Sequence, residues 1–270
     1  DVVVGFQNLG YTVSHYDWTS IRYTTVDEYS DGDSEDGYIV YDHDPQISGK
    51  VSYPKFQTDD GTHVSLRDGL WDPVGSSYDR DRLKFINLPV LKSHHATYGV
   101  TGCVKHYMGV VTRELGTNSH SAIGSGLLGE LLAEIRPADL NILDCVWVNA
   151  DPYDGPWTSY SDATRLDQLV ASTDPVAVDI WAATEILIPA FIANGFNPPW
   201  PEPSAAPDDP SSDFRVYLDN SMNRLLGAGY VVTNDMTQID AVTWDGSEPL
   251  AIFVDGFESG DTDAWSTVAP

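Results

Sequence analysis

Two lysines and a histidine that are suited to hold an anion lie close together in the sequence, at Lys92, His94 and Lys105. Lys92 and His94 alternate with Ser93, so on an extended chain their side chains point to one face. Lys105 follows a glycine-containing turn at Thr101, and backbone N–H groups in such turns are suited to donate to an anion. The pattern predicts a carboxylate- or phosphate-binding site formed by Lys92, His94, Lys105 and Thr101.

A second interpretation of the same residues stays open. Here Lys92, His94 and Lys105 pair with acids in a buried structural network, and the candidate acids are Asp144, Asp174 and Asp179. Asp174 also precedes a proline and is predicted to cap a helix. The spacing of Asp174 and Asp179 does not place both on one helix face, which argues against a catalytic carboxylate pair. The sequence contains no recognisable pair of a nucleophile and a base. Enzymatic activity is therefore undecided, and a non-enzymatic role is favoured.

The charge distribution along the chain also favours binding of an anion near Lys92, His94 and Lys105. The chain has 41 acidic and 14 basic residues and a formal net charge of -27, yet the segment from Arg82 to Arg113 contains no Asp or Glu. A basic island in such a chain attracts an anionic ligand, a neighbouring carboxylate or another subunit. The overall acidity argues against nucleic acid as a partner.

Metal and cofactor signals are weak. His94 and His95 face opposite ways in a strand, and surrounding positive charge disfavours a cation there. Calcium is possible at acidic turns, although neither turn matches an EF-hand loop; the candidates are Asp31, Asp33, Asp255 and Asp261. No other cofactor is predicted.

The cysteines and the glycine run have structural interpretations. Cys103 and Cys145 belong to no CxxC motif, and they either form a disulfide or are buried as free thiols. The run Gly124–Gly129 formally matches a dinucleotide fingerprint, but no convincing strand precedes it. Close helix packing explains its glycines better.

Strands and helices alternate along the chain, which predicts an α/β fold with a mixed or mostly parallel sheet flanked by helices. An irregular helix is expected over 98–111 and better helices over 123–135, from Pro175 onward, and over 214–226. A proline-rich loop is expected over 197–213. No segment is expected to span a membrane. Strands are expected over 2–4, 38–41, 83–88, 140–148, 166–171, 230–232, 239–243 and 250–254.

Three segments together resemble the bacterial domain-of-unknown-function family 362. They are INLPVLKSHHATYGVTGCVKHYMGVV at 86–111, LNILDCVWVNADPYDGPW at 140–157 and LVASTDPVAVDIWAA at 169–183. The resemblance spans about 84–230. Many members of that family carry a ferredoxin-like cysteine cluster, which this sequence lacks, so the resemblance does not imply redox chemistry here.

The last residues bear a second resemblance. AIFVDGFESGDTDAWSTVAP is similar to an ending found on many otherwise unrelated exported bacterial proteins. The resemblance implies export, hence an extracellular or cell-surface protein whose leader has been removed. We therefore expect a single α/β domain over 1–247, followed by an export or assembly tail over 248–270.

These features favour two functions. The first is an extracellular structural subunit that polymerises head to tail with other copies of itself, through terminal strands or tail docking. The second is an enzyme or binding protein for an anionic small molecule held by the Lys/His site. The expected assembly residues are Val2, Val3, Val4, Ile252, Phe253, Phe257 and Trp265.

Overall fold

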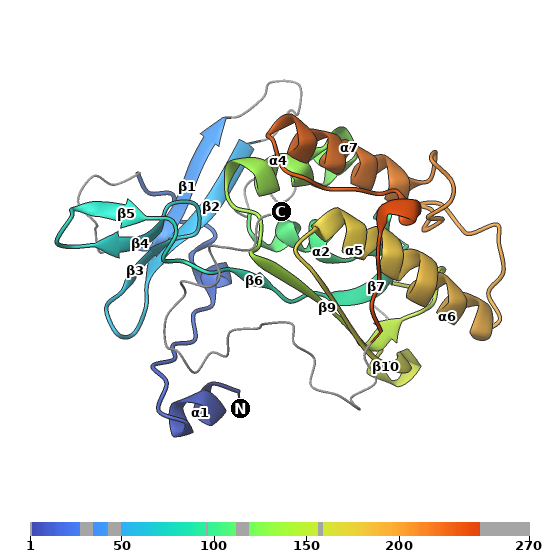
Figure 1. Ribbon diagram of the computed structural model, residues 1–270, viewed down its shortest axis with the longest axis horizontal. Helices are drawn as coiled ribbons and strands as arrows, with labels where there is room; N and C mark the ends of the chain where they lie inside the picture. Colours follow the sequence, from blue (N-terminus) through green and yellow to red (C-terminus); the bar gives the residue numbers. More distant parts are fainter. Residues whose placement is uncertain are drawn as a thin grey trace. The chain divides into compact units, whose positions relative to one another are not determined.

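A computed structural model describes residues 2–27, 35–42, 50–95, 97–111, 119–155 and 159–243. The chain divides into two compact units, Asp1–Met236 and Thr237–Pro270. The first unit contains both β-sheets described below (Figure 1). In the second unit only residues 237–243 are described.

The central sheet has the strand order β10-β9-β7-β8, with β6 also pairing with β9. Strand β9 (Leu140–Asn149) runs parallel to β6 (Ile86–Asn87) and β7 (Val90–His94). It runs antiparallel to β10 (Thr164–Ser172), and β8 (Gly99–Thr101) is antiparallel to β7. The sheet is therefore mixed, and with its flanking helices it confirms the predicted α/β class.

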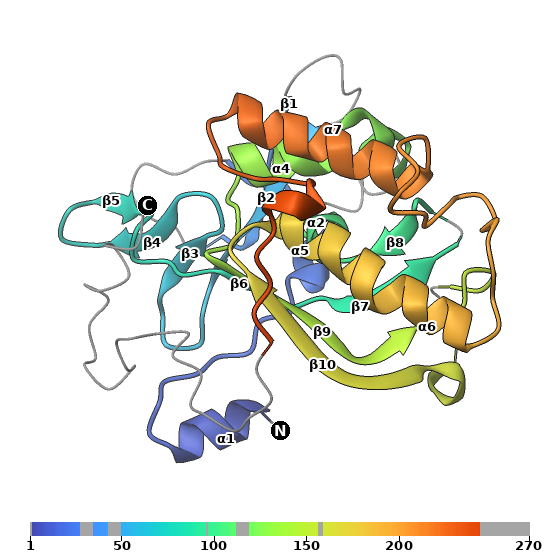
Figure 2. The ribbon, with the colours of Figure 1, turned by 45° about the vertical axis from the view of Figure 1, so that its right-hand side comes forward.

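One long helical segment packs across β9 and β10 (Figure 2). It begins as α5 (Pro175–Ala182), passes through a π-helical turn, η6 (Ala183–Leu187), and continues as α6 (Ile188–Ala193). Asp174 caps α5 by accepting hydrogen bonds from the backbone N of Val176 (2.8 Å) and Ala177 (3.0 Å). The predicted helix start and its cap are confirmed.

The segment 98–111, expected as an irregular helix, forms a strand followed by short helical turns. Its first part is strand β8, and the rest forms the short helix α2 (Cys103–His106) and the 3₁₀ turn η3 (Tyr107–Gly109). The segment 123–135 starts with a 3₁₀ turn, η4 (Ile123–Ser125), and continues as α4 (Leu127–Glu134). Gly126 separates the two with a φ of 90°.

Helix α4 packs against α7 (Asp213–Gly227), and a glycine makes the close approach possible. A Cβ on Gly129 would lie 2.5 Å from the Ser221 Cα, far inside normal contact distance. This geometry confirms helix packing as the role of Gly129.

A second sheet, all antiparallel, precedes the central one in sequence. Its strands follow one another in order, and only the first was predicted from the sequence. They are β1 (Gly37–Asp42), β2 (Lys50–Gln57), β3 (His63–Ser65), β4 (Gly69–Asp72) and β5 (Ser77–Asp79). Strands β3, β4 and β5 have only three or four residues each, and segments this short resemble loops until pairing supplies the backbone hydrogen bonds.

A single buried guanidinium ties this second sheet to the segment after α4. Arg136 is 5% exposed and donates hydrogen bonds to four backbone carbonyls. Its acceptors are the oxygens of Leu66 (3.0 Å), Arg67 (3.5 Å), Arg80 (2.8 Å) and Leu83 (3.0 Å). Because the fixed fork of Arg matches several acceptors at once, one side chain holds two loops in register.

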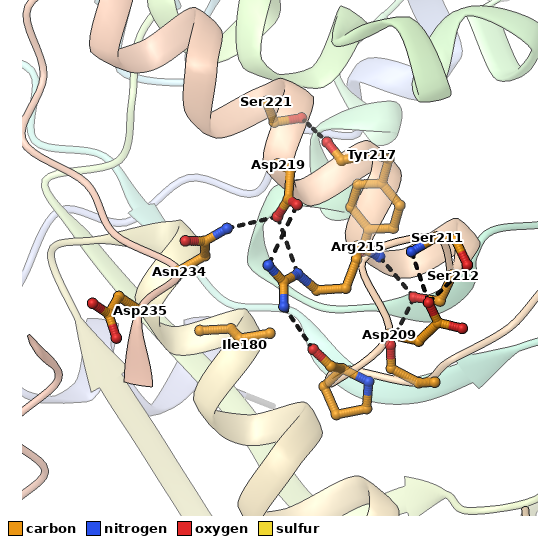
Figure 3. A network of polar contacts seen from close by, with 12 residues as sticks. Ile180, Asp209, Ser211, Ser212, Arg215, Tyr217, Asp219, Ser221, Asn234 and Asp235 are labelled. Atoms are coloured by element: carbon orange, nitrogen blue, oxygen red, sulfur yellow. Dashed lines mark hydrogen bonds and ion pairs between the residues drawn. The ribbon is translucent and has the colours of Figure 1, made fainter. Parts of the chain in front are cut away.

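The proline-rich loop is fixed by a polar network at the start of α7 (Figure 3). Arg215 donates to both carboxylate oxygens of Asp219, at 3.1 and 3.3 Å, and to the Pro207 carbonyl oxygen at 2.8 Å. Asn234 donates to the same carboxylate at 2.6 Å. The network therefore joins the loop, the helix and the segment that follows the helix.

Three strands predicted near the chain's ends were wrong, and a fourth falls outside the described residues. Residues 2–4, expected as a strand, belong to helix α1 (Val2–Asn8). Residues 230–232 and 239–243 form no strand; a 3₁₀ turn, η7 (Met236–Gln238), lies between them. The expected strand 250–254 lies outside the described residues. Two further 3₁₀ turns are η1 (Trp18–Ile21) and η5 (Tyr160–Asp162).

The expectation that no segment could span a membrane also needs correction. By length and composition alone, the run Pro175–Ala193 is apolar enough to cross one. Of this window, 61% is buried within the protein, as is usual for a core helix of a globular domain. Its burial explains its apolar composition without a membrane.

Candidate anion-binding site

The four residues predicted to bind an anion lie together at the end of the β7–β8 hairpin. Lys92 pairs with Thr101 in the strand register. His94 Nδ1 lies 2.6 Å from Thr101 Oγ1 and 3.2 Å from Lys105 Nζ, which projects from α2 directly after the hairpin. We call Lys92, His94, Thr101 and Lys105 the Lys–His cluster.

The contact with Lys105 determines the tautomer of the His94 ring. A lysine ammonium can only donate, so His94 Nδ1 accepts from Lys105 and the imidazole proton resides on Nε2. Burial, together with the charges of Lys105 and Lys92, lowers the pKa of His94 to about 3. The ring is therefore neutral at physiological pH and presents one N–H donor.

Lys105 is an unusual cation because it is buried and has no acidic partner among the described residues. Only 3% of the surface of Lys105 is exposed to solvent. Among the described residues, no carboxylate lies within ion-pair distance of Lys105 or Lys92. Burial and the charge of Lys92 lower the pKa of Lys105 to about 8. A buried charge without a counter-ion is unfavourable, and such groups concentrate at functional sites.

A chain of amides anchors α2 to the sheet, and sequence reasoning missed it. His106 Nδ1 donates to Asn87 Oδ1 at 2.6 Å, because an amide oxygen can only accept. Asn87 Nδ2 donates to Cys103 O and to Asn141 Oδ1, both at 3.0 Å. Asn141 in turn donates to the Ser172 carbonyl oxygen at 3.3 Å. The available signal was two asparagines inside otherwise apolar strands, where a polar side chain needs a partner.

The N-terminus of α2 is occupied by a carboxylate of the protein itself. Asp179, which is 0% exposed, accepts hydrogen bonds from the backbone N of Cys103 (2.6 Å) and of Val104 (2.9 Å). A Cβ on Gly102 would lie 2.3 Å from Asp179 Oδ1, so glycine is needed for this contact. The expectation that these N–H groups would bind a ligand was wrong; they bind Asp179, and burial raises its pKa to about 7.

The other two acids proposed for a structural network also have local partners. Asp174 caps α5 and accepts from the Thr233 backbone N at 2.8 Å, while Asp144 accepts from the Val146 backbone N at 2.8 Å. No hydrogen bond or ion pair within the described ranges joins Asp144, Asp174 or Asp179 to Lys92, His94 or Lys105. The network interpretation therefore finds no support in these contacts.

The remaining candidate residues divide between described and undescribed parts of the chain. Within the described residues, no group of three His, Cys, Asp or Glu side chains could hold a metal ion. Cys103 and Cys145 are buried free thiols. The calcium candidates Asp31, Asp33, Asp255 and Asp261, and the assembly candidates Ile252, Phe253, Phe257 and Trp265, lie outside the described residues.

Comparison with known proteins agrees with part of the resemblance seen in the sequence. Residues 80–184 match the family model described as Domain of unknown function (DUF362). The match contains the whole Lys–His cluster together with Asn87, Asn141 and Asp179. No curated protein and no solved structure matches the chain.

Proposed function

We propose that the protein binds a small molecule carrying a carboxylate or phosphate group at the Lys–His cluster. The observation that carries this proposal is the environment of Lys105. Its ammonium is buried, contacts His94 Nδ1 at 3.2 Å and has no carboxylate partner among the described residues. A bound anion would supply the missing opposite charge and the hydrogen bonds that a desolvated ammonium requires.

Each member of the cluster has a distinct role in this proposal. Lys92 is partly exposed and provides the outer positive charge, while Lys105 provides the inner one. His94 holds the Lys105 ammonium through Nδ1 and keeps Nε2–H as a donor. A pKa near 8 lets Lys105 exchange a proton close to neutral pH, which a general acid or base requires. The geometry supports binding; it assigns no reaction.

Calorimetric titration with inorganic phosphate and with citrate tests the proposal. The wild-type protein is expected to show a binding event that Lys92→Met and Lys105→Met each weaken more than tenfold, with unchanged circular dichroism. Arg165→Gln is the matched control, because Arg165 is an exposed cation on β10 that pairs with Asp167 at 2.8 Å. If folded Lys92→Met and Lys105→Met bind both anions as tightly as the wild type, the proposal is wrong.

A second candidate, homo-oligomeric assembly in an extracellular setting, is favoured by exposed apolar side chains on one face of the central sheet. Val90 and Leu169 both pair with Asp144 in the central sheet, so the side chains of all three share one face. Val90 is 43% exposed and Leu169 is 66% exposed, and Leu88 nearby is 59% exposed. Apolar residues gathered on one sheet face are typical of an interaction surface, and we propose a second copy of the chain as its partner.

Light scattering coupled to size-exclusion chromatography tests the assembly candidate. Leu169→Glu is expected to reduce the oligomer to a monomer, because it replaces an exposed apolar contact with a second carboxylate beside Asp144. Val74→Glu is the matched control, since Val74 is 93% exposed in the turn between β4 and β5. A wild-type protein that stays monomeric at high concentration would remove this candidate and leave anion binding unaffected.

A further inference from the structure

A cleft of about 390 Å³ lies on the second sheet, among residues that the Lys–His cluster does not include. Three basic side chains line it, Lys55, Arg67 and Arg80, together with the aromatic ring of Tyr78. Its volume lies within the range of about 300–1,000 Å³ that small-molecule sites occupy. Basic groups that converge on a cleft in a chain of net charge -27 need a physical explanation.

The only acidic side chain among the described lining residues is already neutralised. Asp68 accepts from Arg67 Nε at 2.9 Å and from Arg67 Nη2 at 3.2 Å, and the Ser65 hydroxyl donates to it at 3.1 Å. The Arg67 guanidinium also lies 4.8 Å from the centre of the Tyr53 ring. Arg67 and Asp68 therefore form a fixed neutral pair, and Lys55 and Arg80 are the other two basic side chains that line the cleft.

Lys55 and Arg80 differ in their surroundings. Lys55 is 4% exposed, and its Nζ donates to the Asp27 carbonyl oxygen at 3.4 Å. Burial lowers the pKa of Lys55 to about 8, while the charge of Asp27 acts in the opposite direction. Arg80 is exposed and uses Nη1 to donate to the Arg67 carbonyl oxygen at 2.6 Å. Within the described ranges its other N–H groups have no hydrogen-bond partner. Arg80 can therefore donate a two-point contact to an oxyanion from the cleft's edge.

The walls of the cleft are held in place before any ligand arrives. Arg136 binds the carbonyl oxygens of both Arg67 and Arg80, which fixes the two segments that carry these side chains. Gly69, with a φ of 99°, allows the β4 strand to approach the Asp79 carbonyl, where a Cβ would lie 2.0 Å from the oxygen. A site fixed in this way loses little conformational entropy on binding.

We propose that this cleft is a second anion-binding site, which takes a small organic molecule whose phosphate or carboxylate group pairs with Arg80, while the buried ammonium of Lys55 adds positive charge to the same cleft. The organic part of the ligand contacts the ring of Tyr78. This site goes beyond the proposed function of the Lys–His cluster, and the two sites share no residue.

The test uses the full chain carrying Lys92→Met, so that the Lys–His cluster does not contribute. Phenyl phosphate, benzoate and inorganic phosphate are the calorimetric probes. Binding of phenyl phosphate or benzoate is expected, and Arg80→Gln is expected to weaken it more than tenfold, with partial recovery in Arg80→Lys. The stronger of the two organic probes identifies the oxyanion, and weaker binding of inorganic phosphate reports the contribution of the organic part.

Two controls keep the inference falsifiable. Arg80 is exposed, so Arg80→Gln is expected to fold, and Arg165→Gln tests the effect of removing an exposed cation elsewhere. Absence of binding of both organic probes to folded Lys92→Met protein overturns the inference. Binding that Arg80→Gln and Arg165→Gln change equally overturns it as well, and neither result bears on the Lys–His cluster.

Discussion

Lys105 Nζ lies 3.2 Å from His94 Nδ1, and this contact joins a buried ammonium to a neutral imidazole, while no carboxylate in the described part of the chain pairs with the ammonium. A lysine that served only the fold would be expected to have an acidic partner, because a desolvated lone charge is unfavourable. The buried ammonium of Lys105 therefore lowers the stability of the folded protein and at the same time favours binding of an anion. Both effects can be measured in variants of the cluster.

Lys105→Met is expected to stabilise the folded protein at pH 7 while removing anion binding. The pKa of Lys105 falls from 10.5 to about 8 on folding. Between these values the unfolded chain binds more protons, so the wild-type free energy of unfolding rises as pH increases from about 8 to 10.5. The Lys105→Met variant lacks this rise, and its free energy of unfolding at pH 7 is expected to exceed that of the wild type by on the order of 1–3 kcal/mol. Chemical denaturation at pH 7 and pH 9.5 measures both effects.

Lys84→Met serves as the control for that prediction, because Lys84 is partly exposed and lies 3.7 Å from Asp139. It is expected to give no gain in stability at pH 7. A loss of stability in Lys105→Met, with the wild-type pH dependence retained, would show that Lys105 is a stabilising structural residue.

Asp179 is expected to make the free energy of unfolding fall as pH rises, which is the opposite of the effect of Lys105, and to do so at lower pH. Folding raises its pKa from 3.8 to about 7, mainly through burial. Between these values the folded state binds more protons, so its contribution to stability falls as pH rises from about 4 to 7. Asp179→Asn should abolish this decline and lower stability overall, because an amide nitrogen cannot accept from the backbone N of Cys103 or Val104.

Denaturation of Asp179→Asn at pH 4.5 and pH 7 measures that change, with the exposed Asp167→Asn as reference. If the decline between the two pH values persists in Asp179→Asn, then Asp179 is not the group that titrates.

Gly102→Ala is expected to destabilise the protein and to weaken anion binding together. The new Cβ would lie 2.3 Å from Asp179 Oδ1, so the carboxylate or the start of α2 must move. Overpacking of this kind costs about 1–3 kcal/mol, and the movement displaces Lys105 on the same helix. Gly109→Ala is a close control, because a Cβ there has no neighbour within 4 Å. Equal melting temperatures for the two variants would contradict the cap geometry.

Gly129→Ala is expected to lower stability without changing anion binding. Its Cβ would meet the Ser221 backbone at 2.5 Å and separate α4 from α7, with a cost of about 1–3 kcal/mol. Gly227→Ala, at the open end of α7, has no neighbour within 4 Å of its Cβ and should be nearly neutral. Thermal melting compares the two, and a neutral Gly129→Ala would mean that the helices tolerate a wider spacing.

The sequence predicted those elements whose signals are local. Asp174 and Pro175 mark the start of α5 through capping and a fixed φ, and the apolar run of β9 identifies a buried strand. The α/β class and the grouping of Lys92, His94, Thr101 and Lys105 were predicted for similar reasons. Two of these residues alternate in one strand, and the others lie in the hairpin and helix that follow it.

Other features depend on partners far away in the sequence and were not predictable. Asp179 caps α2 across 76 residues, from the Asp179 carboxylate to the Cys103 backbone N. The β2–β5 strands become recognisable only when they pair. The β-branched run at Val2–Val4 favoured a strand, but among the described residues it has no partner strand, so its backbone forms the hydrogen bonds of α1 instead.

The most direct test is the pKa of Lys105, measured by NMR from the pH dependence of its side-chain signals with and without citrate. We predict a value near 8 in the free protein, and a clear rise when the anion binds, because an adjacent negative charge favours the ammonium form. Lys105→Met identifies the signal by its disappearance. A Lys105 pKa near 10.5 that citrate leaves unchanged would contradict the account.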